Sequence, residues 1–450
     1  MQRLQLKNYR CFRDLELTFH DRLTVLVAAN GGGKTAVLDG VAVALRPFVD
    51  TMEDRSRSRG FDSKDIRLVL SPNGNMEQIT PIALLASATF LGSSVRWNGA
   101  SLLSGTLRSI TGDDSLEMIA IPLISSNQEY AEGEGRIPPT FPLISYYGTG
   151  RLWSAGRRAD WKKPRETAPN ARHRGYAECL SSSSHYKVFL DWFRRFSYEA
   201  RGEGHDELYP SSSPGRREEP VHDARRTLSV VRGATDIALA PSGWNRLEWD
   251  FAEDALVAHH ISQGRLLVDT LSDGIRNMIG LVADIAHRAA RLNPHIADRA
   301  ALDTPGIVLI DEVDMHLHPA WQQVVLDSLQ EAFPLLQFIV TTHSPQVLTT
   351  VKTENIRIFE DGVVHSATPG TYGAEAQRIL ESIFHVSPRP PKNPKSVALN
   401  EYLRLVDARE WESPRALELR KELDEWSQGH EPRLLAADLE IDNMKWEAGQ

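Results

Sequence analysis

Four short segments of the chain have residue types and spacings suited to nucleotide chemistry, and the first is AANGGGKT at residues 28–35. It follows the P-loop pattern, except that Ala28 stands where a glycine is usual. In such a loop, glycines turn backbone N–H groups toward phosphates, Lys34 reaches the β and γ phosphates, and the Thr35 hydroxyl coordinates magnesium. A plain glycine-rich turn is the alternative, but a strand before and a helix after favour nucleotide binding. The predicted nucleotide contacts here are Asn30, Gly31, Gly32, Gly33, Lys34, Thr35 and Ala36.

The second segment, GIVLIDEVD at residues 306–314, is an apolar strand that ends in two carboxylates. Such a strand would bring Asp311 to a magnesium ion and Glu312 to a position where it polarises an attacking water. An acidic strand end at the surface is the alternative. The uncharged run ahead of the pair favours a buried central strand, whose exit is where α/β proteins bind ligands. We therefore predict Thr35 and Asp311 as Mg²⁺ ligands and Glu312 as the catalytic base.

The third and fourth segments are TTHSPQ at residues 341–346 and LSDGIRNMIGL at residues 271–281. His343 follows an apolar strand, where a histidine can contact a γ-phosphate and position water, although an isolated histidine is more often structural. In the fourth segment a helix begins, and its free N–H groups and dipole suit a phosphate. A simple capped helix start is the other interpretation. The residues at that start are Ser272, Asp273 and Gly274.

The elements around these segments predict an α/β fold. Residues 1–50 show short strands, then the apolar strand LTVLVA, a glycine-rich loop and a helical pattern. Residues 264–360 alternate strands with helices, including a helix over AWQQVVLDSLQEAF, and this alternation implies a largely parallel sheet. We assign the two parts of the nucleotide-binding domain to residues 1–154 and 261–386.

A mostly helical insert is predicted between these parts, over residues 155–260. Residues 185–196, HYKVFLDWFRRF, place their apolar side chains on one helical face, and PSSSPGRREEP at 210–220 is typical of a flexible loop. No sustained heptad repeat occurs, so a long coiled coil is not expected.

The last region, residues 387–450, follows the Pro-rich stretch SPRPPKNPK and is predicted to be helical. Ser413 and Pro414 have the residue types of a helix start. The helix that they begin carries apolar residues on one face, namely Ala416, Leu419, Leu423 and Trp426. Because this face needs a surface to bury against, we expect the region to dock a partner chain, with the head itself as the alternative.

Composition excludes several classes of protein. The 450 residues are 41% hydrophobic and carry a net charge of −9, so any nucleic-acid contact requires a local basic surface. No apolar run is long enough to span a membrane, and the start lacks a secretory pattern, so we expect a cytoplasmic protein with no membrane partner. Cys11 and Cys179 are too few for a disulfide framework or a four-ligand zinc site.

A local basic surface is present between residues 151 and 174, where arginines and lysines are interleaved with Trp153 and Trp161. Basic and aromatic side chains together can hold nucleic acid through phosphate contacts and base stacking. A solvated or nucleotide-adjacent loop is the equal alternative. The candidate nucleic-acid contacts are Arg157, Arg158, Lys162 and Lys163.

A second cluster, Asp314 with His316 and His318, has metal-ligand residue types. It follows directly on the acidic strand end. We therefore favour a structural or dimer-contact role over a dedicated transition-metal site.

Taken in order, AANGGGKT, LSDGI, LIDEVD and TTHS resemble the Walker A, signature, Walker B and switch-histidine motifs of ABC ATPases. Four motifs in this order are far more specific than any one. The opening NYRCF resembles the N-F/Y-R-x-F segment of RecF and SMC-like heads, which implies that Arg10 lies near the nucleotide.

Further stretches, including YYGTGRLW, DEVDMHLHPAWQ and GTYGAEAQRIL, resemble the bacterial family described as predicted ATP-binding proteins involved in virulence. That family is related to the ATPases of the Septu and some retron anti-phage systems. Two positions depart from the LSGGQ signature, where Asp273 and Ile275 replace the second glycine and the glutamine. No Q-loop glutamine is assigned, because YYGTG occupies its expected region.

The resemblance implies an ABC ATPase head, that is, a P-loop NTPase with a mixed sheet flanked by helices. Its cofactors would be ATP and Mg²⁺. The signature of one protomer closes over the nucleotide of another in such heads, so a homodimer or higher homo-oligomer is expected, with Ser272, Asp273 and Gly274 acting in trans.

The function we expect is an ATPase subunit of a bacterial anti-phage system that controls a separate effector, a nuclease. A RecF-like repair or recombination ATPase that acts directly on DNA is the alternative. The NYRCF start and the unusual signature disfavour a transporter subunit. EIDN near the end is not the acidic cluster of a Toprim nuclease, so no intrinsic nuclease domain is expected.

Overall fold

The computed structural model describes residues 1–53, 61–90, 92–101, 116–133, 137–150, 172–181, 186–202, 218–360, 362–447 and 449. The chain divides into two compact units, Met1–Ile379 and Leu380–Gln450. The first unit is α/β and contains all four segments with nucleotide chemistry, and the second is helical.

A six-stranded sheet lies at the centre of the first unit, in the order β15-β14-β3-β13-β12-β8. Its strands are β3 (Leu23–Ala28), β8 (Leu143–Tyr147), β12 (Gly306–Ile310), β13 (Leu336–Thr341), β14 (Ile356–Glu360) and β15 (Val363–Ser366). All neighbouring strands are parallel except β14 and β15. Every residue of β3, β8 and β13 is buried, as expected for parallel strands covered on both faces. The carboxyl ends of β3, β13, β12 and β8 therefore lie along one edge.

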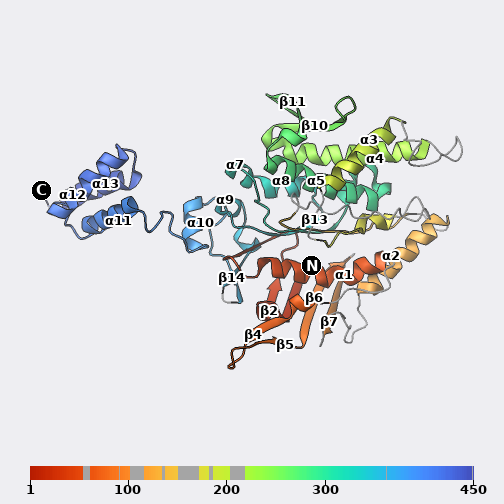
Figure 1. The fold of residues 1–450 in the computed structure, drawn as a ribbon, viewed down its shortest axis with the longest axis horizontal. Coiled ribbons are helices and arrows are strands. Elements are labelled where there is room, and N and C mark those ends of the chain that lie inside the picture. Colours follow the sequence, from red (N-terminus) through yellow and green to blue (C-terminus); the bar gives the residue numbers. More distant parts are fainter. Residues whose placement is uncertain are drawn as a thin grey trace. The chain divides into compact units, whose positions relative to one another are not determined.

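A second, antiparallel sheet has the order β2-β1-β6-β7. Its strands are β1 (Arg3–Tyr9), β2 (Phe12–Thr18), β6 (Ile82–Phe90) and β7 (Ser93–Ser101), and a separate hairpin pairs β4 (Arg67–Leu70) with β5 (Met76–Ile79). Helix α1 (Lys34–Met52) lies between this sheet and the central one (Figure 1). Its Gly40 packs so closely on β1 that an added Cβ would lie 2.8 Å from Leu6 Cδ1.

Four helices lie on the other side of the central sheet (Figure 1). They are α3 (Tyr186–Ala200), α4 (Glu218–Leu239), α5 (Asp273–Leu292) and α8 (Val325–Ala332). Helix α4 is packed on α5 and α8. Helix α3 confirms the helix expected over residues 185–196. Its Trp192 stacks on His287 of α5, with ring centroids 4.0 Å apart and the planes 13° from parallel.

The final part of the predicted insert is a sheet and not a helix. It contains β9 (Trp244–Asp250) and β10 (Ala255–His260), which form an antiparallel sheet with β11 (Gly264–Leu267) just beyond the insert. On β9, Leu247 and Trp249 are buried while Arg246 and Glu248 are exposed, which is the period-2 alternation of a half-buried strand. Of the flexible loop expected at 210–220, residues 210–217 lie outside the described part of the chain and 218–220 belong to α4.

The helix expected over residues 320–333 is divided in two. Helix α7 (Pro319–Gln322) ends before α8, because the backbone of Val324 departs from helical geometry at φ −123°. The remaining helices before α11 are α2 (Leu116–Ala131), α6 (Ala300–Asp303), α9 (Pro345–Leu348) and α10 (Ala376–Ser382). Segments of 3₁₀ helix are η1 (Ser63–Asp65), η2 (Arg172–Tyr176), η4 (Ala240–Ser242), η5 (Val268–Thr270), η6 (Pro294–Arg299) and η7 (Thr353–Asn355).

The second unit consists mainly of three helices around one small core. They are α11 (Pro394–Asp407), α12 (Pro414–Ser427) and α13 (Pro432–Glu447). The Ser413 hydroxyl accepts a hydrogen bond from the Ala416 N–H and so caps α12, as the sequence predicted. Leu419 and Leu423 of α12 are buried in the unit's own core together with Leu399 and Leu434. The argument that Ala416, Leu419 and Leu423 need a partner chain is therefore wrong, because the neighbouring helices already cover them. Trp426, the fourth apolar residue of that face, is 42% exposed.

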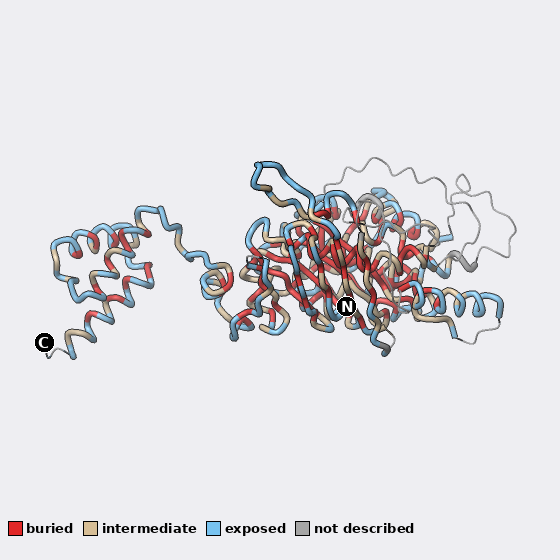
Figure 2. The backbone as a smooth tube through the Cα atoms, turned by 90° about the horizontal axis from the view of Figure 1, so that it is seen from below, coloured by how far each residue is buried: buried red, intermediate tan, exposed pale blue. Residues whose placement is uncertain are grey.

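Burial follows these elements. Figure 2 shows buried residues along the strands of the first unit and along the inner sides of the helices in the second. Among the residues described, no helix combines the length and apolar character needed to cross a bilayer.

Candidate functional site

The P-loop begins where β3 leaves the centre of the sheet. All residues of β3 are buried, and the loop that follows contains Gly31 and Gly33 at φ 79° and 93°. Both values lie in the left-handed region that glycine adopts without strain. At Gly33 an added Cβ would also lie 2.4 Å from Phe12 Cζ. The turn into α1 therefore requires glycine, and the N–H groups at the start of α1 face this loop.

Lys34 is held inside the loop. Its Nζ donates to the carbonyl oxygens of Ala28 at 2.9 Å and Ala29 at 3.4 Å, and the residue is only 7% exposed. Burial lowers the pKa of the Lys34 ammonium, while the carboxylates of Asp311 and Glu312 oppose that shift. A cation is thus placed where phosphate oxygens would meet it.

Three segments meet at the end of β12 through the carboxylate of Asp311. Thr35 Oγ1 donates to Asp311 Oδ2 at 2.8 Å, and Thr341 Oγ1 donates to Asp311 Oδ1 at 2.6 Å. The Asp311 N–H also donates to the carbonyl oxygen of Tyr147 at 2.8 Å. Asp311 is 4% exposed, so both carboxylate oxygens are fixed by bonds within a buried site.

Glu312 is fixed by the same threonine. Its N–H donates to Thr341 Oγ1 at 2.7 Å, and the next N–H, of Val313, donates to the Thr341 carbonyl oxygen at 3.0 Å. The Glu312 backbone has φ 49°, a left-handed conformation that is unusual for this residue type. Such strain often accompanies functional positions. This bend turns the chain out of β12 directly after Asp311.

His343 lies just beyond the end of β13, the strand next to β12. It is half-buried, and its neighbours on both sides are fixed by hydrogen bonds. Thr342 Oγ1 donates to Asp314 Oδ1 at 2.5 Å, and Ser344 Oγ accepts from the Val347 N–H as the cap of α9. The position of His343 is therefore set by the strand and the helix that flank it.

The signature segment forms the start of α5. Ser272 occupies the N-cap position and is exposed, and its side chain makes no capping hydrogen bond. Gly274 packs against the loop after β12, since an added Cβ would lie 2.5 Å from the His316 carbonyl oxygen. Asp273 pairs with Arg276 one turn later. The helix start is thus tied to the loop that follows Asp311 and Glu312, and it presents Ser272 outward.

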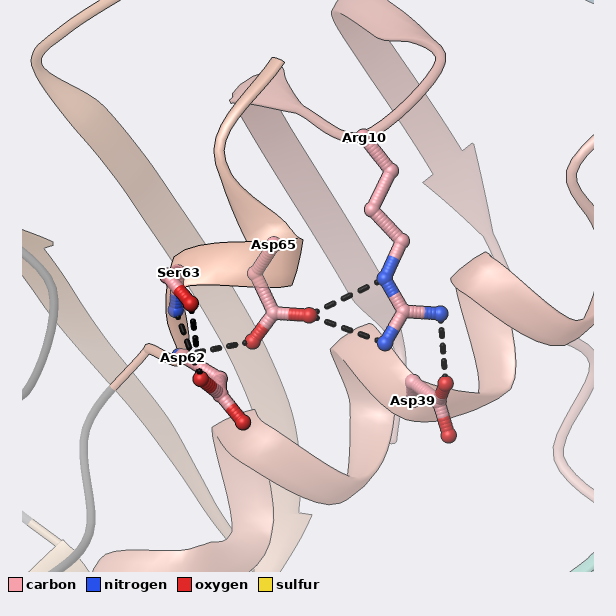
Figure 3. Close-up of polar contacts among 5 residues, drawn as sticks. All are labelled: Arg10, Asp39, Asp62, Ser63 and Asp65. Atoms are coloured by element: carbon pink, nitrogen blue, oxygen red, sulfur yellow. Dashed lines mark hydrogen bonds and ion pairs between the residues drawn. The ribbon is translucent and has the colours of Figure 1, made fainter. Parts of the chain in front are cut away.

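Arg10 lies at the turn between β1 and β2, beside the first turns of α1 (Figure 3). Its guanidinium contacts Asp39 of α1 at 2.6 Å and Asp65 of η1 at 2.8 Å. Burial and then the charge of Asp39 raise the pKa of the nearby Tyr146 hydroxyl, which keeps this ring neutral. The structure therefore places Arg10 in a polar cluster next to the P-loop helix, and its contact with nucleotide stays a prediction.

The residues at this edge fit Mg²⁺ with a nucleoside triphosphate. Thr35 and Asp311 offer oxygen ligands close together, which is the small protein contribution that Mg²⁺ usually takes alongside phosphate oxygens. Among the described residues no group of three His, Cys, Asp or Glu side chains could hold a metal. The Nδ1 of His318 instead accepts from the Ala320 N–H and caps α7.

Sequence reasoning missed Thr341, which bonds both Asp311 and Glu312. Its signal was available, because a hydroxyl residue ends the buried strand next to the acidic one. Asp39 and Asp65 were also missed, since nothing local in the sequence connects them to Arg10. The candidate nucleic-acid contacts at residues 157–163 lie outside the described part of the chain.

The fold and the site define a P-loop nucleotide-binding protein in which a long insert separates the two halves of the domain. Family comparison agrees: a model described as an AAA domain matches residues 3–184. A second, described as an AAA domain, putative AbiEii toxin, Type IV TA system, matches residues 262–349. The two matches cover the segments that contain the P-loop and the Asp311 strand.

Two relatives match almost the whole chain. The chain is 26% identical to the "Retron Ec83 probable ATPase" of Escherichia coli, covering 99% of this chain and 87% of the relative. It is 22% identical to the "Retron Vc95 probable ATPase" of Vibrio cholerae serotype O1 biovar El Tor, covering 94% and 86%. A shorter match, 32% identical over 26% of this chain and 16% of the relative, is to the Septu protein PtuA of Bacillus mycoides (strain KBAB4). The resemblance to retron and Septu ATPases is confirmed.

Proposed function

We propose that this chain binds ATP with Mg²⁺ at its P-loop and hydrolyses it. The observation that carries the proposal is the buried contact of Thr35, Asp311 and Thr341, which joins three distant segments at one sheet edge. Thr341 also fixes the backbone of Glu312. A general base must be held in place relative to the metal ligand, and the shared bonds of Thr341 to Asp311 and to the Glu312 N–H support these two roles.

Each residue has a distinct role in the proposed reaction. Lys34 and the N–H groups of the P-loop neutralise and orient the phosphates, and Thr35 with Asp311 would hold Mg²⁺, which supplies positive charge beside the β and γ phosphates. Glu312 holds the attacking water and accepts its proton while the water oxygen bonds to the γ-phosphorus. The bond from the γ-phosphorus to the β–γ bridging oxygen of ATP breaks, and that oxygen leaves as part of ADP. His343 orients the water or the γ-phosphate from the neighbouring strand.

The proposed active form is a head-to-tail dimer that encloses two ATP molecules. Ser272 supports this proposal, because it is an exposed N-cap residue without a capping bond of its own side chain. In a dimer, the start of α5 would place this hydroxyl and the Gly274 N–H on the γ-phosphate held by the partner. The tight packing of Gly274 on the His316 carbonyl would transmit that contact to the strand end at Glu312.

The test uses Glu312→Gln, which keeps the shape of the side chain and removes its charge. ATP hydrolysis should fall by roughly a hundredfold or more while ATP still binds. Because ATP then persists, light scattering should show ATP-dependent dimers or larger oligomers, and adding Ser272→Arg should abolish them. Near-normal turnover with an unchanged assembly in Glu312→Gln would reject both the base and the shared site.

We further propose that the ATPase acts in anti-phage defence by controlling a separate effector chain, a nuclease. Support comes from the relatives, which bear the names of retron and Septu systems and match this chain over most of its length in the two retron cases. The neighbouring genes provide a direct check. An adjacent nuclease or reverse transcriptase gene agrees with defence, whereas replication genes agree with the RecF-like alternative.

The proposed effector surface is on α13, which has apolar residues on two opposite sides. Leu434, Ala437 and Ile441 are buried in the core of the second unit. On the opposite side, Leu435, Leu439 and Trp446 are 53%, 67% and 83% exposed.

The three exposed apolar residues of α13 form one stripe along a helix of 3.6 residues per turn. Exposed acids flank it at Glu440, Asp442 and Glu447. The surface fits an apolar helix or groove with a rim of lysines and arginines.

Co-expression with the product of the adjacent nuclease gene tests this surface. Leu439→Glu should lose the nuclease in a pull-down, while Leu417→Glu, a matched control on α12 that is 58% exposed, should keep it. Truncation after residue 387 should also lose the nuclease and retain ATP hydrolysis. Retention of the nuclease by the truncated chain would disprove docking on this unit. If Leu439→Glu changes only the self-association of the chain, the stripe contacts a second copy of this chain and not the nuclease.

A further inference from the structure

The insert contains a cavity that the proposed ATP site does not use. It is about 300 Å³ in volume and lies between the end of α3, the middle of α4 and β9. This size is at the lower end of the range of small-molecule sites in proteins. The lining residues that matter for its chemistry are Ser197, Arg201, Arg225, Arg232, Trp249 and Phe251.

The cavity is strongly basic. Three of its lining residues are arginines and none is acidic. Among the described residues, Arg201, Arg225 and Arg232 form no ion pair, although neighbouring arginines do, such as Arg194 with Asp254 at 2.6 Å. Three guanidinium groups that share one concave surface repel one another, and an anion between them relieves that repulsion.

The guanidinium groups are also held in place. The Nε of Arg225 donates to the Ala200 carbonyl oxygen at 2.9 Å, and the Nε of Arg232 donates to the Leu247 carbonyl oxygen at 3.0 Å. A guanidinium has five N–H donors, so the terminal nitrogens of both remain available for oxygen ligands. Arg201 stacks 4.0 Å above the ring of Phe251. The positive charges are thus oriented by the fold before any ligand arrives.

Two further lining residues carry buried polar atoms that lack a partner in the described part of the chain. They are the Ser197 hydroxyl and the Trp249 indole N–H, in side chains that belong to residues 4% and 9% exposed. A serine within a helix ordinarily donates to a carbonyl of the preceding turn, and a buried indole N–H ordinarily finds an acceptor. Both atoms are buried beneath the lining, so the three arginines are the groups that a ligand in the cavity can reach.

We infer that this cavity binds a phosphate ester of about the size of one nucleotide. Phosphate supplies the negative charge that three arginines require and the acceptor oxygens for their terminal N–H groups. Aromatic side chains in the wall favour a ligand with a ring attached to the phosphate. The same chemistry could come from a free nucleotide or from one nucleotide unit of a nucleic-acid strand.

The test uses the full chain with Lys34→Ala, so that binding at the P-loop does not obscure the cavity. Titration calorimetry with AMP tests for a free nucleotide, and fluorescence anisotropy with a labelled oligothymidylate of six residues tests for a strand. In this background, Arg225→Glu should reduce the affinity for the probe that binds at least tenfold. Arg194→Glu, on the same helix as Ser197 but outside the cavity lining, should bind as the parent does.

The outcomes separate the sources and can overturn the inference. Loss of AMP binding in Arg225→Glu identifies a free nucleotide, and loss of oligothymidylate binding alone identifies a strand. Arg225→Gln, with an unchanged thermal midpoint, separates lost charge from lost folding. If neither probe binds at millimolar concentration, or if Arg225→Glu binds as tightly as Arg194→Glu, the cavity is not a phosphate site. These binding measurements do not depend on ATP hydrolysis, so their failure would leave the proposed ATPase activity untouched.

Discussion

The carboxyl edge of the central sheet and the second unit are stabilised by polar contacts of very different range. At the edge, Thr35 bonds Asp311 across 276 positions of sequence. In the second unit, the contacts between helices are local, such as Arg420 with Asp438, 18 positions apart. Arg389 and Glu431, 42 positions apart, make one of its longer bonds.

This difference predicts whether the effect of a substitution stays local or alters distant segments of the chain. At the sheet edge, polar groups from three segments meet on two buried carboxylate oxygens, so a change in one hydroxyl alters the geometry of a shared site. In the second unit, one small core joins three consecutive helices. A change there should remain within the unit, because its helices bury their apolar faces against one another.

The largest effect is expected for Lys34→Ala. The substitution removes the cation that the P-loop carbonyls of Ala28 and Ala29 hold, so ATP binding or turnover should be abolished. The fold should persist, since one P-loop side chain contributes little to the core. Nucleotide binding and circular dichroism measure the two parts. A normal rate of ATP turnover in this variant would show that the catalytic site is not at this loop.

A smaller loss of turnover is expected for Thr341→Val, which keeps the volume and deletes one hydroxyl. That hydroxyl bonds both Asp311 and the Glu312 N–H. Bonds to a charged group contribute about 1.5–3 kcal/mol, so kcat should fall roughly tenfold to a hundredfold. Thr51→Val is the matched control, because that hydroxyl bonds only the Pro47 carbonyl within α1. Equal rates in the two variants would show that Thr341 does not position the carboxylates.

Acidification should lower the stability of the first unit more than that of the second. Burial lowers the pKa of His287 to about 3, and the ring of Trp192 stacks on the imidazole. The unfolded chain binds the proton near pH 6.5, so the stabilisation is complete above that pH and is lost as pH falls toward 3. The loss approaches about 1.4 kcal/mol per pH unit. In the described part of the second unit, His385 and His430 are exposed.

Thermal unfolding between pH 7 and pH 5 measures this effect. The first unit should lose stability on acidification, and His287→Phe, which retains a stacked ring without a titrating proton, should reduce the loss. Identical pH dependence in the variant and the parent would assign the acid sensitivity to other groups.

The smallest effect on turnover is expected for a core substitution in the second unit. Leu399 is fully buried among its three helices, and Leu399→Ala should cost the unit about 2–5 kcal/mol. ATP hydrolysis should stay within about twofold of the parent, because no residue of the P-loop or of the β12 edge lies in this core. Limited proteolysis measures the stability of the second unit, and phosphate release measures the rate of ATP hydrolysis. A large fall in turnover would show that the second unit supports the ATP site.

Local patterns in the sequence were sufficient to predict much of the fold. The apolar run that became β3, the glycines after it and the acidic end of β12 each carry their own signal. The cap at Ser413 was equally readable, since a capping residue acts within one turn. The alternation of Leu247 and Trp249 with charged residues also marked β9, but the helical segments around it outweighed that short pattern.

Sequence by itself determined which residues bring phosphate-binding, metal-binding and basic groups, because residue chemistry and spacing along one element are local properties. Only the tertiary structure decided which of them share a site. Thr341 reaches Asp311 because β12 and β13 are parallel neighbours in register, with Ile310 opposite Val340. Arg10 meets Asp39 and Asp65 because α1 lies beside the β1–β2 turn. Contacts of this kind depend on packing between distant segments, which no local pattern encodes.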